Sequence, residues 1–197
     1  ATTGHPTLAE VAADPIGANA ALGRFTNFAN LLGLSALAVP AGRVAGLPFG
    51  VMLAGPAGAE AKLATVARTV EPRVRLAVVG AHLRGQPLNH ELTDLGGRFV
   101  AATTTAPEYR LHALATVPPK PGLVRVPSGG AAITAEVWDL PVSGFGAFVA
   151  AVPAPLTIGR IRLADGSEVS GFLCEPAALA GAPDISAKGG WVAHLNS

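Results

Sequence analysis

The sequence predicts an α+β protein made of an α/β block followed by a small, mostly antiparallel domain that resembles a barrel. Residues 1–72 alternate between helical and strand-like apolar spacing, whereas residues 73–197 contain short strand-like runs separated by turns. Half of the 197 residues are apolar, and 24 Gly and 17 Pro supply the turns. The chain is therefore long and apolar enough to build a core.

In the first block, residues 7–11 are a short helical or turn segment, and the apolar spacing indicates a helix at 19–32. Strands at 35–40 and 49–55 and an amphipathic helix at 60–70 follow. Two strands and a few helices cannot bury their own apolar faces. We therefore expect this block to be the edge of a larger α/β sheet. A very short junction, Glu71-Pro72-Arg73, leads into the second block.

The second block is predicted to hold strands at 74–79, 98–105, 109–114, 123–126, 132–138, 158–163 and 169–174. The last two alternate about Asp165-Gly166, which is a hairpin signal. A weak helix is expected at 142–152, and Pro118-Pro119-Lys120-Pro121-Gly122 is interpreted as a rigid loop.

Composition excludes several function classes. The net charge is +1 and no basic run occurs, so we expect no nucleic-acid partner. Pro, Gly, Asn or Arg interrupts every apolar run, so we expect no membrane span, and the first residues lack the features of a signal peptide. A single cysteine, Cys174, fits a reducing compartment, and we expect a cytoplasmic protein. The chain begins without Met, which suggests a fragment.

The stretch 78–90 holds the main candidate site. A buried strand ends at Gly80, and Gly85 punctuates the loop that follows. Asn89 is expected to cap a short helix that stops at Gly96. A strand, a tight Gly loop and a helix start point backbone N–H groups at one spot, which suits a carboxylate or phosphate. His82 lies in this loop and is suited to proton transfer, although a loop histidine bonded to backbone is the alternative.

Other polar residues are weaker candidates. Tyr109 and Arg110 lie where a strand could reach the loop and orient a ligand, and a structural role is open for both. Glu136 either points inward as a functional carboxylate or faces solvent. The five histidines are scattered, so we expect no metal, and the absence of a phosphate-loop motif leads us to expect no cofactor.

Two segments of the chain resemble a known family. Residues 26–34, 38–42 and 46–51 resemble the C-terminal end of an amidase-signature domain, and Thr26-Asn27-Phe28-Ala29-Asn30-Leu31-Leu32 resembles its allophanate hydrolase branch. Residues 79–89, 106–111, 118–123, 172–176 and 189–191 resemble the C-terminal domain of that enzyme. The resemblance implies two domains, 1–72 and 73–197, and it keeps the same order across both.

The resemblance also implies what this chain lacks. The amidase domain uses a Ser–cis-Ser–Lys triad in a Gly/Ser-rich segment, and no such segment occurs here. The amidase step is therefore not expected of this chain. The junction at 71–73 is shorter than the family implies, so we expect that linker residues near 70–73 are missing from the sequence.

The second domain resembles the γ-glutamylcyclotransferase-like fold, whose first loop binds a substrate carboxylate through backbone N–H groups. By this resemblance Gly80, Ala81 and Leu83 are expected to bind the substrate carboxylate, although Val79 and His82 stand where that fold has a tyrosine and a leucine. We take His82 as the candidate catalytic residue, as an acid or hydrogen-bond donor to the reacting nitrogen. Arg84, Tyr109 and Arg110 are expected to assist. Cyclotransferases need an acid that this chain lacks between Asp139 and Asp165.

The allophanate hydrolase resemblance instead implies decarboxylation of N-carboxycarbamate, the product of the amidase step in urea degradation, to carbamate and carbon dioxide. The rival interpretation is a non-catalytic domain. Its few charges suit an interface that holds a homo-oligomer together or docks a urea carboxylase.

Overall fold

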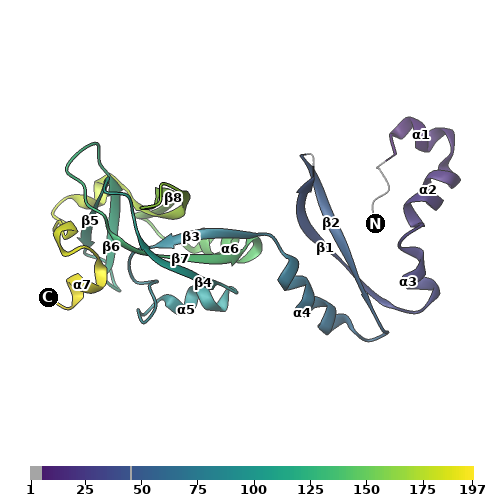
Figure 1. The fold of residues 1–197 in the computed structure, drawn as a ribbon, viewed down its shortest axis with the longest axis horizontal. Coiled ribbons are helices and arrows are strands. Elements are labelled where there is room, and N and C mark those ends of the chain that lie inside the picture. The colour runs from purple at the N-terminus through teal and green to yellow at the C-terminus, as the bar shows by residue number, and fades with distance from the viewer. Residues whose placement is uncertain (1–5, 45) are drawn as a thin grey trace. The chain divides into compact units, whose positions relative to one another are not determined.

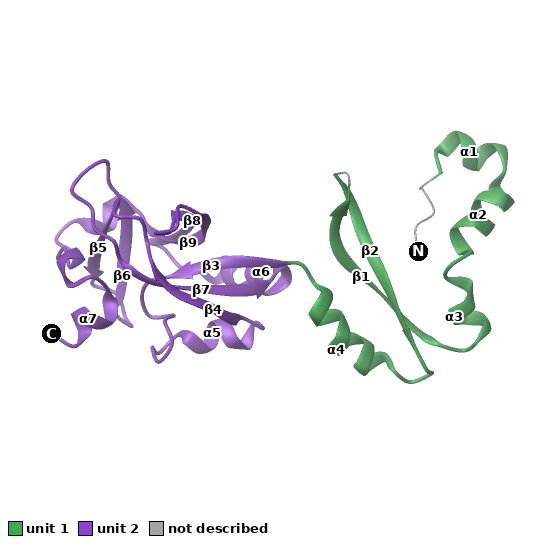
Figure 2. Ribbon diagram, viewed as in Figure 1, with its two compact units in different colours: residues 1–72 green, residues 73–197 purple. Residues whose placement is uncertain are grey.

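The computed structural model describes residues 6–44 and 46–197. The chain divides into two compact units, residues 1–72 and residues 73–197 (Figure 2). In these described residues no helix combines the length and apolar character needed to cross a membrane. The two units are taken separately below.

The first unit has helices, a hairpin and a further helix (Figure 1): α1 (Leu8–Ala13), α2 (Pro15–Gly23), α3 (Asn27–Leu31), β1 (Ser35–Val44), β2 (Leu47–Gly55) and α4 (Glu60–Val70). Strands β1 and β2 pair antiparallel with Ser35 opposite Gly55. Both strands extend closer to the turn between them than the predicted ranges 35–40 and 49–55. Helix α4 packs on this hairpin through the buried Leu63.

This unit buries little of its apolar surface. Leu8, Ile16 and Leu31 are each more than 80% exposed, while Val39 and Leu63 are among the few buried side chains. An antiparallel hairpin with one helix covers only one face, so the other apolar positions stay in solvent. The exposure agrees with the expectation that this block does not form a complete core by itself.

The second unit holds most of the strands: β3 (Arg73–Val78), α5 (Asn89–Asp94), β4 (Arg98–Thr104), β5 (Tyr109–Leu114), β6 (Lys120–Arg125), β7 (Thr134–Pro141), α6 (Val142–Ala151), β8 (Leu156–Arg162), β9 (Glu168–Cys174) and α7 (Trp191–Leu195). The predicted strands and the helix at 142–152 are confirmed, with ends shifted by a few residues. The hairpin about Asp165-Gly166 is also confirmed, because β8 and β9 pair antiparallel.

A five-stranded sheet in the order β4-β7-β3-β9-β8 forms the centre of this unit. Strand β3 pairs antiparallel with β7 and parallel with β9. Leu76, Ala77 and Val78 are fully buried because β3 is central and both its faces are covered, which accounts for its continuous apolar run. Helix α6 packs against β3 and β7. The mixed α+β class is therefore confirmed.

The barrel-like expectation is wrong in the part of the chain that the structure describes. The edge strands β4 and β8 meet at a single bridge, between Thr105 and Leu163, and do not pair along their length. After Thr105 the chain turns into β5, which pairs with β6 as a separate hairpin. The sheet therefore stays open, since β6 packs beside β9 without extending the sheet.

Candidate functional site

The loop that follows β3 is tightly folded. The Leu83 N–H donates to the Gly80 carbonyl at 2.9 Å, and the Leu88 N–H donates to the Ala81 carbonyl at 2.9 Å. Glycine is required at position 80, because a Cβ there would lie 2.4 Å from the Cγ and Cδ atoms of Pro121. The loop backbone therefore approaches the start of β6 more closely than any side chain would allow.

Several N–H groups of this loop are buried without a partner. Gly80, Ala81 and His82 are buried, and their amides donate to no other group in the described ranges 6–44 and 46–197. Leu83 differs, because its amide is used inside the turn. N–H groups in buried segments are nearly always paired, so three successive amides without an acceptor could receive an anionic ligand. The expected anion site thus has the amides of residues 80–82, without that of Leu83.

The His82 imidazole lies between two aromatic rings. It stacks on Phe172 with centroids 5.0 Å apart and 14° between planes, and it meets the Phe148 ring edge-on at 5.1 Å and 76°. Its Nε2 atom lies 2.9 Å from Oε2 of Glu91, on helix α5. These three contacts fix both the plane of the ring and the direction of Nε2, and Nδ1 has no hydrogen-bond partner among the described residues.

The environment keeps the imidazole neutral. Burial lowers the pKa of His82, while the hydrogen bond and the charge of Glu91 oppose that effect, and the charges of Lys120 and His90 lower it further. At neutral pH the ring is therefore uncharged, with Nε2–H donating to the Glu91 carboxylate. Nδ1 then carries a lone pair in the unliganded site.

Asn89 does not cap helix α5 as expected. The N-cap position is Leu88, without a side-chain hydrogen bond, and the Asn89 side-chain amide donates to the His82 carbonyl at 2.8 Å. The predicted stop at Gly96 is confirmed, since Gly96 follows the helix with a φ of 77°. Asn89 thus ties the start of α5 to the loop, and this brings Glu91 within reach of His82.

A cavity of about 520 Å³ opens beside the His82 ring. Its polar lining comes from His82, His90, Glu91, Asp94 and Lys120, and its apolar lining from Leu95, Ala147, Phe148, Ala151, Val152, Pro153, Leu156 and Phe172. A small hollow of about 20 Å³ adjoins it and is lined by Val79, Gly80, Ala81 and Pro121. Both spaces share His82, Lys120, Leu156 and Phe172, so the free loop amides and the large cavity belong to one site.

Lys120 and Glu91 are site residues that the sequence interpretation missed. The sequence predicts a rigid loop at Lys120, but this residue starts β6 and lines both the cavity and the hollow. In the sequence, the one indication of a role for Lys120 is that it lies in residues 118–123, which resemble the allophanate hydrolase domain. Glu91 lies nine residues after His82, and only the turn of the loop shows that the two side chains meet.

Tyr109 and Arg110 are not brought to this cavity. The Tyr109 hydroxyl lies in a fully buried position, where it accepts from Arg125 at 2.8 Å and from the Arg162 amide at 2.9 Å. Arg110 donates to the Gly129 carbonyl at 3.1 Å and lies 3.6 Å from the Asp184 carboxylate. Both residues stabilise the β5–β6 hairpin and its neighbours, so the geometry gives them a structural role.

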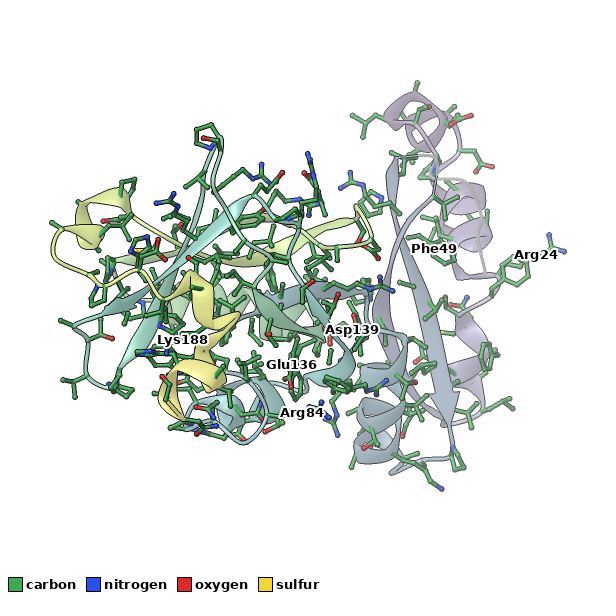
Figure 3. The ribbon with its side chains drawn as sticks, turned by 60° about the vertical axis from the view of Figure 1, so that its left-hand side comes forward. Arg24, Phe49, Arg84, Glu136, Asp139 and Lys188 are labelled. Carbon is green, nitrogen blue, oxygen red and sulfur yellow. The ribbon has the colours of Figure 1, made fainter. Side chains whose placement is uncertain are left out.

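Arg84 does not line the cavity, and its side chain lies beside Glu136 (Figure 3). Its Nε donates to Glu136 Oε1 at 2.9 Å, and its backbone N–H donates to Glu136 Oε2 at 3.0 Å. The Arg84 guanidinium carbon lies 3.5 Å from the centre of the Phe99 ring, a cation–π contact. The buried Glu136 carboxylate, which also accepts from Trp138 at 3.1 Å, therefore anchors the end of the loop.

The groups that line the site are of types suited to anion recognition and proton transfer. Across residues 6–44 and 46–197, no three His, Cys, Asp or Glu side chains gather closely enough to hold a metal ion. The groups that do converge are a lysine, free amides and a carboxylate-bound imidazole. This arrangement can bind a carboxylate and move one proton at Nδ1.

Comparison with known proteins identifies relatives for the whole chain. The family described as the allophanate hydrolase C-terminal domain matches residues 74–196. Urea amidolyase of Saccharomyces cerevisiae is 36% identical over 231 residues, which cover 97% of this chain and 13% of that protein. Urea amidolyase of Lachancea kluyveri is also 36% identical, over 98% of this chain and 13% of that protein. The chain thus spans only a small part of the length of these relatives. The alignment of 231 residues is longer than the 197 residues of this chain.

Solved structures agree with these relatives. The crystal structure of Kluyveromyces lactis urea amidolyase is 36% identical with a TM-score of 0.62, over 97% of this chain and 14% of that one. The crystal structure of c4763, a uropathogenic Escherichia coli-specific protein, is 38% identical with a TM-score of 0.60. It covers 64% of this chain and 97% of its own length, so that protein is little longer than the region it shares with this chain.

Proposed function

Because the chain belongs to the family with the allophanate hydrolase C-terminal domain, we propose that residues 73–197 decarboxylate N-carboxycarbamate within urea degradation. The observation that supports this most directly is the Glu91-bound His82 ring beside three unpaired loop amides and Lys120. The amidase step, which would supply the substrate from allophanate, belongs to the amidase-signature domain of which residues 1–72 are the proposed C-terminal end.

The reaction requires one proton. The substrate is a nitrogen that carries two carboxylates, and one C–N bond breaks to release carbon dioxide. The electron pair of that bond stays on nitrogen, which takes up a proton and becomes the amino group of carbamate. An acid placed at the nitrogen therefore lowers the barrier by stabilising charge as it develops.

Binding is assigned to the buried end of the cavity. The Lys120 ammonium and the amides of Gly80, Ala81 and His82 would hold one carboxylate, because charge-assisted hydrogen bonds are strong where water is excluded. Asp94 also lines the cavity, but it is exposed and its repulsion of the substrate is screened by solvent. The charge of Glu91 is balanced once His82 is protonated.

His82 would supply the proton from Nδ1. In the unliganded site its pKa is lowered by burial, so the ring is neutral. A dianion bound against the ring favours the imidazolium and raises that pKa, so the ring gains its proton as substrate binds. Glu91 keeps Nε2 engaged, which directs the transferable proton to Nδ1 and therefore to the substrate nitrogen.

The test follows carbon dioxide release from freshly generated intermediate. An allophanate-cleaving amidase supplies N-carboxycarbamate in the presence of this chain or of its His82→Ala variant. We expect His82→Ala to lower the decarboxylation rate by roughly 10²–10⁴-fold, the usual contribution of a general acid. An unchanged rate would remove His82 from the mechanism and leave the assembly or carboxylase-docking role as the better explanation.

A further inference from the structure

The cavity beside His82 is larger than the proposed substrate needs. N-carboxycarbamate has roughly seven non-hydrogen atoms, which occupy about 200 Å³ if each takes the ~30 Å³ that one water molecule takes in the liquid. The cavity measures about 520 Å³. More than half of the space therefore remains when the anion end is filled.

The remaining space has an apolar wall. Helix α6 has no charged side chain, and its residues Ala147, Phe148, Ala151 and Val152, the last at its C-cap, line the cavity together with Leu156. These α6 positions are spaced i, i+1, i+4 and i+5 and so lie on one side of the helix. Ala147 and Ala151 are exposed, because the wall that they form faces open space and not the core.

Lys120 and the loop amides gather beside the small hollow. Lys120, His82 and the amides of residues 80–82 adjoin the small hollow, whereas the α6 residues line the large cavity alone. A ligand that matches both parts has a carboxylate at one end and hydrocarbon at the other. Neither urea nor its carboxylated derivatives have such a hydrocarbon part.

We propose that this cavity binds carboxylates that carry an apolar arm, with the carboxylate at Lys120 and the loop amides and the arm along α6. This inference rests on the proposed function in one respect only, the binding of a carboxylate at Lys120 and the amides of residues 80–82. Each methylene that is buried against α6 contributes about fourfold in affinity, which corresponds to ~0.8 kcal/mol. Such compounds then compete with the decarboxylation substrate for the same amides.

The experiment titrates the 197-residue chain with sodium acetate, butanoate, hexanoate and octanoate by calorimetry. We expect the affinity to rise by at least tenfold from acetate to hexanoate, since four further methylenes leave water. An affinity that stays flat along the series would overturn the proposal. If neither acetate nor hexanoate binds, the anion end itself is overturned.

Two tryptophan variants of α6 locate the binding site. Ala151→Trp fills the wall of the cavity and is expected to remove the preference for hexanoate over acetate. Ala150→Trp is the matched control, because Ala150 is an exposed α6 residue that does not line the cavity, and it should keep the preference. If Ala151→Trp still prefers hexanoate over acetate, the hydrocarbon part of hexanoate does not lie along α6, and the proposed site for the apolar arm is overturned.

The two proposals fail separately. The chain-length preference is an equilibrium measurement on non-reactive carboxylates, whereas the decarboxylation role depends on the effect of His82→Ala on carbon dioxide release. A flat series together with a large His82→Ala effect would overturn the apolar arm alone. A steep series together with an unaffected rate would overturn the decarboxylation alone.

Discussion

At the residue scale, the protonation of His82 is set by its neighbours. Burial between Phe148 and Phe172 disfavours the charged ring, and Glu91 at 2.9 Å favours it. The first effect is the larger, so the pKa falls below its ordinary value. A bound anion is expected to raise the pKa of His82, because nearby negative charge favours the protonated ring.

This balance predicts a pH effect on stability. The lowered folded-state pKa means that the unfolded chain binds more protons at this site between that pKa and about 6.5. Wild-type protein should therefore lose stability as the pH falls through this window, by at most about 1.4 kcal/mol per pH unit from this group. His82→Phe keeps the ring stacking and should lose less on acidification, as measured by urea unfolding between about pH 7.5 and 5. Parallel slopes for the two proteins would contradict the assignment.

Glu91 should set the pH range of the reaction. Glu91→Gln removes the charge that raises the pKa of His82, so the pKa falls further. Because the proposed mechanism needs the protonated ring, the rate should decline at a lower pH than in wild type, with a loss of roughly 10–100-fold near neutrality. The measurement is a pH–rate profile of carbon dioxide release. Asp94→Asn serves as the control, because Asp94 lines the same cavity without bonding to His82, and a profile shifted equally in both variants would argue against the Glu91 contact.

At the element scale, the loop after β3 is held at both ends. Gly80 fits against Pro121 of β6, and the Arg84 amide is bound by Glu136 of β7. Two strands that are distant from the loop in sequence, β6 and β7, therefore help to determine where the free amides point. Two substitutions test these two anchors.

Gly80→Ala should disturb the first anchor. Its Cβ would lie 2.4 Å from a rigid proline ring, so the loop must shift. We expect a loss of about 1–3 kcal/mol in the free energy of unfolding, together with weaker binding of acetate. Gly146→Ala in α6 is the control, because its Cβ meets nothing within 4 Å and a helical alanine should stabilise by about 0.4–1 kcal/mol. Equal stability of both variants would contradict the close approach to Pro121.

Glu136→Gln should disturb the second anchor. One side-chain oxygen becomes an NH₂ group that cannot accept from Arg84 or Trp138, and the site is buried. The expected loss is about 1–3 kcal/mol in urea unfolding. Glu168→Gln is the matched control, since Glu168 meets arginines only at 3.7 and 3.9 Å on the surface and should cost less than about 1 kcal/mol. A Glu136→Gln variant as stable as Glu168→Gln would show that the carboxylate is not an anchor.

At the scale of the whole molecule, the two units differ in how well each buries its own surface. The main core contains residues from Leu76 to Trp191, all of them in the second unit (Figure 2). The first unit leaves large side chains such as Leu8 and Leu31 in solvent. Cooperative stability is therefore expected from the second unit.

A truncation tests this difference. Residues 73–197 alone should fold and unfold in one transition, with a Tm within a few degrees of the main transition of the full chain, because the core is intact. Differential scanning calorimetry of both proteins gives the comparison. A truncated protein without a transition would show that the first unit supplies essential packing.

Local features of the fold can be predicted from the amino-acid sequence alone. Apolar spacing predicted the strands and helix α6, the Asp165-Gly166 turn was recognisable, and Gly80 and His82 marked the loop with the free amides. These features depend on near neighbours in the chain and on the backbone freedom of glycine, which residue identity alone specifies.

The set of side chains that share the site depends on how distant elements fold together. Alternation of apolar and polar residues tells on which side of a sheet a residue lies, but not which element packs against that side. The sequence therefore predicts Tyr109 and Arg110 near a loop that they do not reach. Glu91 and Lys120 entered the site because α5 and β6 fold back against His82. The open sheet was decided in the same way, since closure depends on whether two edge strands, β4 and β8, meet in space.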